Sequence, residues 1–128
     1  MADAYLAQMH KYCREYGGAI FLAEDAGEVV GLVMVLSRVP FEQLDEPPGH
    51  YALVAELVVR EGFRRRGIAR ALLDVAERHA RDAGAPELRI DVLSENTAAR
   101  QLYLREGFAP YKETLTKSLK AAARVASA

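Results

Sequence analysis

Apolar residues near the start of the chain recur first with the period of a helix and then with the period of strands. Tyrosine and methionine side chains lie three or four residues apart, which predicts a helix over residues 3–16. Residues 19–25 and 28–38 are rich in valine, isoleucine and leucine, and Ala26 and Gly27 separate them. Such runs on either side of a short glycine-containing turn predict a pair of strands.

The middle of the chain pairs a strand with the most clearly amphipathic helix. Residues 39–50 contain two adjacent prolines and a glycine, which predicts a loop. Residues 51–60 form an apolar run that predicts a strand buried on both faces. Helical periodicity is strongest over residues 66–83, where the apolar stripe consists of Ile68, Leu72, Val75, Ala76, Ala80 and Ala83.

The last third of the chain repeats the alternation of strand and helix. Residues 87–93 predict a strand, residues 94–107 a helix, and residues 108–119 a final strand. Residues 120–128 are expected to form a frayed tail. This order predicts a single α/β (α+β) domain over residues 1–128.

Composition and charge exclude several classes of protein. Hydrophobic residues make up 51% of the 128 residues, enough for a core, and the formal net charge of −1 is unlike that of a nucleic-acid-binding domain. The single cysteine, Cys13, excludes an internal disulfide and a cysteine-built metal site. Because the N-terminal region has no long apolar run, we expect no membrane contact and a cytoplasmic location.

A cluster of arginines stands where the predicted strand gives way to the predicted long helix. Arg64, Arg65 and Arg66 are followed at once by Gly67. The first amides of a helix lack partners and carry partial positive charge, so this is a candidate anion site, with phosphate as the usual occupant. The alternatives are a solvated basic turn and, less favoured by the net charge, nucleic-acid binding. The Walker A pattern of nucleotide-binding loops is absent.

Two carboxylates lie inside otherwise apolar runs. Glu56 belongs to the strand predicted over residues 51–60, and Asp91 to the strand predicted over residues 87–93. Burial raises the pKa of a carboxyl group and makes it a better base at neutral pH, so both are candidate general bases. Alternation puts Glu56 on the same face as Val58. We favour Glu56 over Asp91, and a relay through water is the third alternative.

Three sequence segments together resemble one family. The segment "RRRGIA" at residues 64–69 matches the (Q/R)-x-x-G-x-(G/A) signature of the GNAT N-acetyltransferases. "NTAARQLYLREGF" at residues 96–108 is similar to their asparagine–tyrosine–Gly-Phe segment, and "AELVV" at residues 55–59 resembles the strand before the signature. The resemblance extends over residues 19–119.

The resemblance implies the GNAT fold: a central mixed, mostly antiparallel sheet that splays between two parallel strands and is flanked by helices. The splayed strands would be those that hold Leu57 to Val59 and Ile90 to Leu93. In the family a strand and a helix precede the helix predicted here over residues 3–16. The fold is therefore expected to be shortened at the N-terminus, either because this is a short member or because its first segment is missing.

The resemblance also implies the acyl donor, acetyl-CoA, and no metal. The pyrophosphate would bind the amides of Arg65 to Arg70, and the pantetheine arm would pair with the strand before them. The residues expected to contact acetyl-CoA are Leu57, Val58, Val59, Arg64, Arg65, Arg66, Gly67, Ile68, Ala69, Arg70 and Asn96. By the same resemblance Tyr103 is the general acid; from the residues alone, Asn96 also suits a helix cap.

The function implied is N-acetyl transfer from acetyl-CoA to a primary amine, directly within a ternary complex. The amine would belong to a small molecule, a peptide or a protein. The acidic loop residues Glu42, Asp45 and Glu46 would suit a cationic amine, but we favour the alternative, a solvated loop. The alternative is a non-catalytic acyl-CoA-binding regulatory module on the same fold. The short N-terminal part suggests a homodimer.

Overall fold

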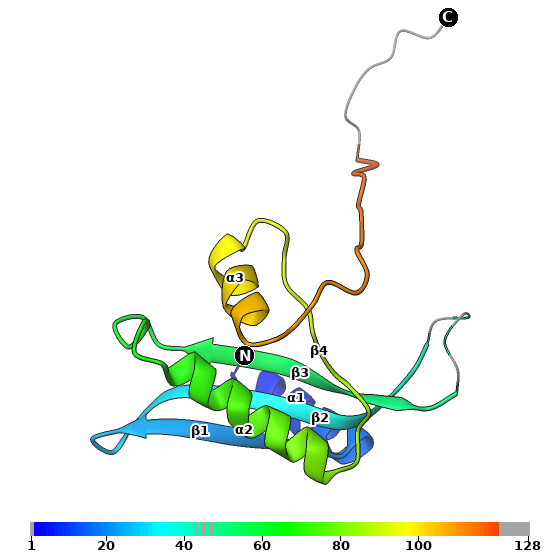
Figure 1. Cartoon of the computed structure of the whole chain (residues 1–128). Coiled ribbons are helices and arrows are strands. Elements are labelled where there is room, and N and C mark those ends of the chain that lie inside the picture. The colour runs from blue at the N-terminus through cyan, green and yellow to red at the C-terminus, as the bar shows by residue number, and fades with distance from the viewer. Residues whose placement is uncertain (1, 43, 45, 47, 121–128) are drawn as a thin grey trace, which may run out of the picture.

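The computed structural model describes residues 2–120 apart from residues 43, 45 and 47. Its helices and strands appear in Figure 1. In chain order they are α1 (Ala2–Tyr16), β1 (Gly18–Asp25), β2 (Glu28–Pro40), β3 (His50–Val59), α2 (Ile68–Asp82), β4 (Leu88–Ile90) and α3 (Thr97–Arg105). The predicted order of elements is confirmed as far as α3. None of the described helices is long and apolar enough to cross a bilayer.

The strands form one mixed sheet in the order β1-β2-β3-β4. The pairs β1–β2 and β2–β3 are antiparallel, whereas β3 and β4 are parallel. Helices α1 and α2 lie on opposite faces of this sheet, and α3 lies beyond the β3–β4 side (Figure 1). The predicted fold class, a mostly antiparallel mixed sheet flanked by helices, is confirmed.

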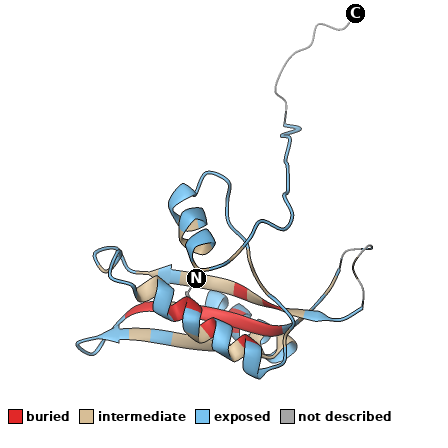
Figure 2. Ribbon diagram, viewed as in Figure 1, coloured by how far each residue is buried: buried red, intermediate tan, exposed pale blue. Residues whose placement is uncertain are grey.

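The larger part of the core lies between the sheet and α2. Val33 and Val35 of β2 are fully buried, and they pack with Leu72, Leu73 and Ala76 of α2. Figure 2 shows this buried band along the middle strands and the inner side of α2. Every third or fourth residue of α2 therefore faces the sheet, as its amphipathic sequence predicts.

A second cluster occupies the opposite face. Met9 of α1 packs against Met34 and Leu36 of β2, and all three are buried. Successive residues of β2 thus alternate between the two helices, which is why this strand is apolar along its whole length. Helix α1 covers one face of the sheet and helix α2 covers the other.

The parallel pair separates soon after it begins. Residues Ala52 to Val54 pair with Leu88 to Ile90, and β3 then continues alone on that side to Val59. The register between β2 and β3 shifts at the same point, because Met34 faces Glu56 whereas Val35 faces Val54. A bulge at this position bends β3 and increases its local twist. The splay expected between the two parallel strands is therefore present.

Three expectations about strands were wrong. The strand predicted over residues 87–93 is only Leu88–Ile90, because the parallel pairing stops where β3 bulges. Residues 108–119 form no strand, because no neighbour pairs with them within the described part of the chain. Nor is β3 buried on both faces at its end, since Val58 is 46% exposed. The predicted tail, residues 120–128, lies outside the described residues except for Lys120.

Candidate functional site

The turn between β3 and α2 has an unusual main-chain conformation. The amide of Phe63 donates to the carbonyl of Arg60 at 3.0 Å, which closes a tight turn directly after the strand. Arg65 and Gly67 both have positive φ angles, of 65° and 79°. Gly67 is the N-cap residue of α2, and no side chain caps this helix. The glycine is needed here because other residues adopt this conformation only with strain.

The amides at the start of α2 are available to an anion. The first hydrogen bond that closes a turn of this helix runs from the Ala71 amide to the Gly67 carbonyl at 3.0 Å. Ile68, Ala69 and Arg70 precede it, so their amides have no carbonyl to reach within the helix. No atom lies within 4 Å of the position that a Cβ would occupy on Gly67. The helix terminus is therefore open, uncapped and positively polarised.

The arginines around this terminus differ in what they contact. Arg64 donates through Nε to the carbonyl of Val59 at 3.3 Å, and the Arg66 guanidinium lies over the Phe63 ring, 5.0 Å from its centroid. Arg70 forms an ion pair of 3.4 Å with Glu106 at the end of α3. Two of these side chains contact the turn and the third links α2 to α3, and all of them are exposed to solvent.

The last part of β3 presents main-chain groups to the open side of the splay. The Arg60 amide donates to the Val30 carbonyl at 2.8 Å, so residue 60 points its amide toward β2. Along an antiparallel pair of strands, the main-chain groups of successive residues point alternately toward the partner strand and away from it. The amide and carbonyl of Val58 therefore point toward β2, and those of Leu57 and Val59 point away from it. The groups of Leu57 and Val59 thus line the splay, where Arg64 already occupies the Val59 carbonyl.

Glu56 lies on the face of the sheet that carries α1. It is half-buried, and its Oε2 accepts a hydrogen bond from the Tyr5 hydroxyl at 2.5 Å. This bond, with smaller contributions from burial and from the carboxylate charge, raises the pKa of Tyr5. Val58 pairs with Leu32 and Glu56 pairs with Met34, both on the α1 face, so the predicted alternation is confirmed. The contact with Tyr5 was not predicted.

Tyr103 lies on the face of the sheet that carries α2, where α3 packs against the core between the sheet and α2. Its ring packs edge-on against Phe108, with centroids 6.0 Å apart. Burial raises the pKa of Tyr103, so the hydroxyl keeps its proton at neutral pH. Asn96 caps α3, because its side-chain oxygen accepts a hydrogen bond from the Ala99 amide at 3.2 Å. The open edge of β3 therefore has Glu56 on one face and Tyr103 on the other.

Asp91 and Glu46 have surroundings that differ from those expected. Asp91 follows the end of β4 and is exposed, so the burial that made it a candidate base is missing. Glu46 forms an ion pair with Arg89 at 2.5 Å and accepts a hydrogen bond from the Tyr111 hydroxyl at 2.7 Å. It does not stand open toward an incoming cation. Asp45 lies outside the described residues.

Arg89 is the centre of a cluster that sequence reasoning missed. Its side chain is only 12% exposed, and its guanidinium lies 4.0 Å from the Tyr51 ring, 4.5 Å from the Tyr111 ring and 5.1 Å from the Phe41 ring. Glu87 supplies a second carboxylate at 2.9 Å. No local pattern predicts this cluster, because its members come from distant parts of the chain. It joins β4 to the loop before β3.

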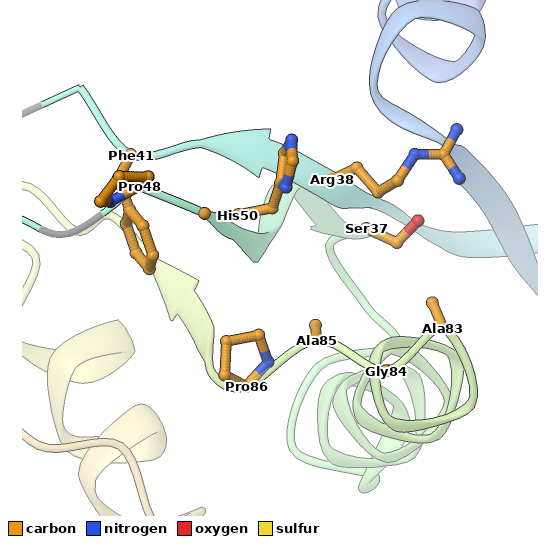
Figure 3. A pocket seen from close by; sticks show the side chains of 10 residues that line it. Ser37, Arg38, Phe41, Pro48, His50, Ala83, Gly84, Ala85 and Pro86 are labelled. Atoms are coloured by element: carbon orange, nitrogen blue, oxygen red, sulfur yellow. The ribbon is translucent and has the colours of Figure 1, made fainter.

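A cavity of about 360 Å³ lies at the opposite end of the sheet from Gly67. Its lining includes Arg38 and His50 together with Ala83 and Pro86, which follow the end of α2 (Figure 3). The 15 residues of α2 separate this cavity from the helix N-terminus by about 22 Å. It contains none of the predicted site residues. Within the described residues, no group of three or more histidine, cysteine, aspartate or glutamate side chains is placed to hold a metal ion.

Comparison with known sequences gives matches along most of the chain. A profile of the "Acetyltransferase (GNAT) family" matches residues 2–108. The N-alpha-acetyltransferase of Sulfurisphaera tokodaii is 34% identical over 108 residues, which are 80% of this chain and 63% of that protein. The N-alpha-acetyltransferase of Sulfolobus acidocaldarius is 32% identical over 108 residues, 80% of this chain and 62% of that protein. The chain thus spans less than two thirds of the length of these relatives.

Solved structures share the fold. The aminoglycoside acetyltransferase AAC(6')-Iy, in complex with the bisubstrate analogue CoA-S-monomethyl-acetylneamine, superposes with a TM-score of 0.76 at 23% identity, covering 93% of this chain and 80% of that one. A putative acetyl transferase from Pyrococcus furiosus gives a TM-score of 0.74 at 21% identity, covering 92% and 76%. At these identities the likeness concerns the fold alone.

Proposed function

The chain belongs to the acetyltransferase (GNAT) family, and on that premise we propose that it transfers the acetyl group of acetyl-CoA to a primary amine. Transfer is direct, within a ternary complex of the protein, the donor and the amine. The observation that carries this proposal is the continuity of two features. The open edge of β3 at Leu57 and Val59 runs into the turn that ends at the uncapped N-terminus of α2.

These two features suit the two halves of acetyl-CoA. Its pyrophosphate is a compact anion, which an uncapped helix N-terminus with an unobstructed Gly67 accommodates. Its pantetheine arm is rich in amides and pairs with an open strand edge as an added strand would. The residues proposed to hold acetyl-CoA are Leu57, Val58, Val59, Arg64, Arg65, Arg66, Gly67, Ile68, Ala69, Arg70 and Asn96. When bound, acetyl-CoA supplies an activated acyl group and a thiol leaving group.

Each step of the transfer has a candidate group in this chain. Glu56, oriented by the Tyr5 hydroxyl, accepts the proton that the amine must lose. A main-chain amide on the open edge of β3 stabilises the negative charge that develops on the carbonyl oxygen, a contribution typically worth about 3 kcal/mol. Tyr103 donates its hydroxyl proton to the departing sulfur; burial raises its pKa, so the hydroxyl is protonated at neutral pH, although it is a weaker acid than an exposed tyrosine. Asp91 is the second candidate base, now without burial in its favour.

The proposed acceptor is an α-amino group. Support comes from the relatives at 32–34% identity, which are named N-alpha-acetyltransferases. Their match includes 80% of this chain, although the chain spans only 62–63% of their length. A peptide N-terminus is therefore the first acceptor to test, and a lysine side chain in the same peptide is its internal control. The cytoplasmic location expected from the sequence stays a prediction.

One experiment distinguishes an enzyme from a non-catalytic binding module by measuring two quantities, the melting temperature and the release of CoA. Acetyl-CoA should raise the melting temperature of the protein, and a peptide with a free α-amine should then trigger release of CoA and become acetylated. Because Cys13 carries a free thiol, CoA should be quantified by chromatography rather than by a thiol reagent. Thermal stabilisation without any amine-dependent CoA release would favour the binding module. Absence of both would refute the acetyl-CoA site.

A further inference from the structure

The helix that carries Tyr103 is weakly attached to the rest of the molecule. None of the nine residues of α3, all of which the structure describes, is buried. Its apolar contacts with the core are made by Leu102 and Tyr103, together with Phe108 just after the helix. Figure 1 shows α3 beyond the edge of the sheet, whereas α1 and α2 each lie over a face. A helix with so few buried contacts can shift at little cost in free energy.

One ion pair joins the end of α3 to another helix. Glu106 is the C-cap residue of α3, and its Oε1 lies 3.4 Å from Nε of Arg70 in the first turn of α2. The other hydrogen bonds that residues 95–108 form within the described part of the chain all stay inside residues 93–108. The pair of Arg70 and Glu106 is therefore the polar link between this region and the rest of the described molecule.

The two partners of this ion pair differ in their exposure. The side chain of Glu106 is only 16% exposed, whereas that of Arg70 is 69% exposed. A pair with so exposed a cation adds little to the overall stability of the fold. A carboxylate that is mostly withdrawn from water nevertheless needs a cation, and without one it moves toward solvent. The contact with Arg70 therefore determines where the end of α3 lies relative to α2.

A displacement of Glu106 would be transmitted to Tyr103. Glu106 follows Tyr103 by three residues and Leu102 by four, a spacing that puts side chains on the same side of a helix. The Glu106 amide donates to the carbonyls of Leu102 and Tyr103 at 3.0 and 3.1 Å, so the last turn of α3 is closed around these residues. A misplacement of about 1 Å in a reacting group can lower a rate by about 100-fold.

We infer that Glu106 is a positioning residue, whose ion pair with Arg70 holds α3 so that the Tyr103 hydroxyl stays beside the donor sulfur. This inference rests on the proposed function, in which Tyr103 protonates the departing thiol. Arg70 then has two tasks: its main-chain amide belongs to the proposed pyrophosphate site, and its side chain holds Glu106. Replacing Glu106 with glutamine removes a negative charge near an anion site, so acetyl-CoA should bind as well as before or more tightly.

The test is a double-mutant cycle of Glu106→Gln and Tyr103→Phe, measured by steady-state kinetics with acetyl-CoA and a peptide α-amine. Glu106→Gln keeps the size of the side chain and should lower kcat by roughly 10-fold, without weaker acetyl-CoA binding in calorimetry. In the Tyr103→Phe background the same substitution should cause no further loss. Equal losses in both backgrounds, weaker donor binding, or a parent kcat in the single variant would each overturn the inference.

Glu95→Gln is the matched control for the loss of charge. Glu95 lies just before the other end of α3, and its exposed side chain forms no hydrogen bond or ion pair within the described residues. The control variant should keep the parent kcat in both backgrounds. A loss in Glu95→Gln equal to that in Glu106→Gln would mean that charge alone, and not the contact with Arg70, is responsible.

Hydrogen exchange measures the attachment of α3 without any catalysis. Amides of residues 100–106 should exchange roughly 2- to 5-fold faster in Glu106→Gln than in the parent or in Glu95→Gln, because the ion pair is lost. Parent-like exchange in Glu106→Gln overturns the inference even if kcat falls. Faster exchange in a protein that acetylates no amine would refute the proposed function, and with it the catalytic role of Glu106, but not its attachment of α3.

Discussion

Replacing Gly67 with valine tests the anion site at the start of α2. Gly67 has a φ of 79°, and a Cβ added there would meet no atom within 4 Å apart from those of its chain neighbours. The left-handed conformation costs the fold about 1–2 kcal/mol for any residue with a Cβ. We expect the larger effect on binding, because the valine side chain would stand beside the amides of Ile68 and Ala69, where we propose that the anion binds. Loss of two such hydrogen bonds at about 1–1.5 kcal/mol each weakens acetyl-CoA by roughly 30- to 150-fold.

Gly84, at the other end of the same helix, provides a matched control. Its φ is 80° and it too has no atom within 4 Å of a built Cβ. Gly84→Val therefore carries the same backbone strain without touching the anion site. Calorimetric titration with acetyl-CoA should give parent affinity for Gly84→Val and the predicted loss for Gly67→Val. Equal affinity in all three proteins, or an equal loss in both variants, would refute the reasoning.

Three further substitutions test the remaining groups. Tyr103→Phe should lower kcat by roughly 10- to 1000-fold with little change in acetyl-CoA affinity, since general acid catalysis is typically worth about 10²–10⁴; matching kcat values in steady-state kinetics would exclude the role. Because burial raises the pKa of Tyr103 above its ordinary value of 10.0, parent activity should persist to at least that pH and then fall as the hydroxyl loses its proton. Glu56→Gln should lower turnover at neutral pH and remove the lower limb of the pH–rate profile, whereas an unchanged profile would point to Asp91 or to water. Arg89→Met should destabilise the fold by about 3 kcal/mol in denaturant unfolding, because it leaves Glu46 without its cation, and a loss below about 1 kcal/mol would contradict the structural role of this pair.

Sequence patterns predicted the parts of the fold that depend on neighbours along the chain. The hairpin turn at Ala26 and Gly27, the amphipathic α2 and the cap at Asn96 are all local, and all are confirmed. The strand predicted over residues 108–119 is absent, because the local sequence does not determine whether a neighbouring strand is available to pair with that segment. β4 is short for a similar reason, since its length is set by the bulge in β3.

In the candidate site, too, the features set by neighbours along the chain were predictable, whereas the contacts between distant residues were not. The uncapped helix terminus at Gly67 was predictable, because a strand, a turn and a helix follow one another within a few residues. The contact of Tyr5 with Glu56 spans 51 residues of sequence and that of Arg89 with Glu46 spans 43, and no pattern encodes either pairing. Asp91 was assigned burial from its apolar neighbours, but those neighbours are themselves exposed beyond the end of β4.

Direct detection of the product tests the central claim, that this chain moves an acetyl group to an amine. The protein is incubated with acetyl-CoA and a peptide that carries one free α-amine and one lysine, and fragment mass spectra locate any acetyl group. We predict that the α-amine becomes acetylated only when the protein and acetyl-CoA are both present, and that one CoA is released per acetyl group transferred. In Tyr103→Phe the rate of acetylation should fall by the factor given above for kcat. Binding of acetyl-CoA without acetylation of either amine, across a library of peptides and small amines, would contradict the account.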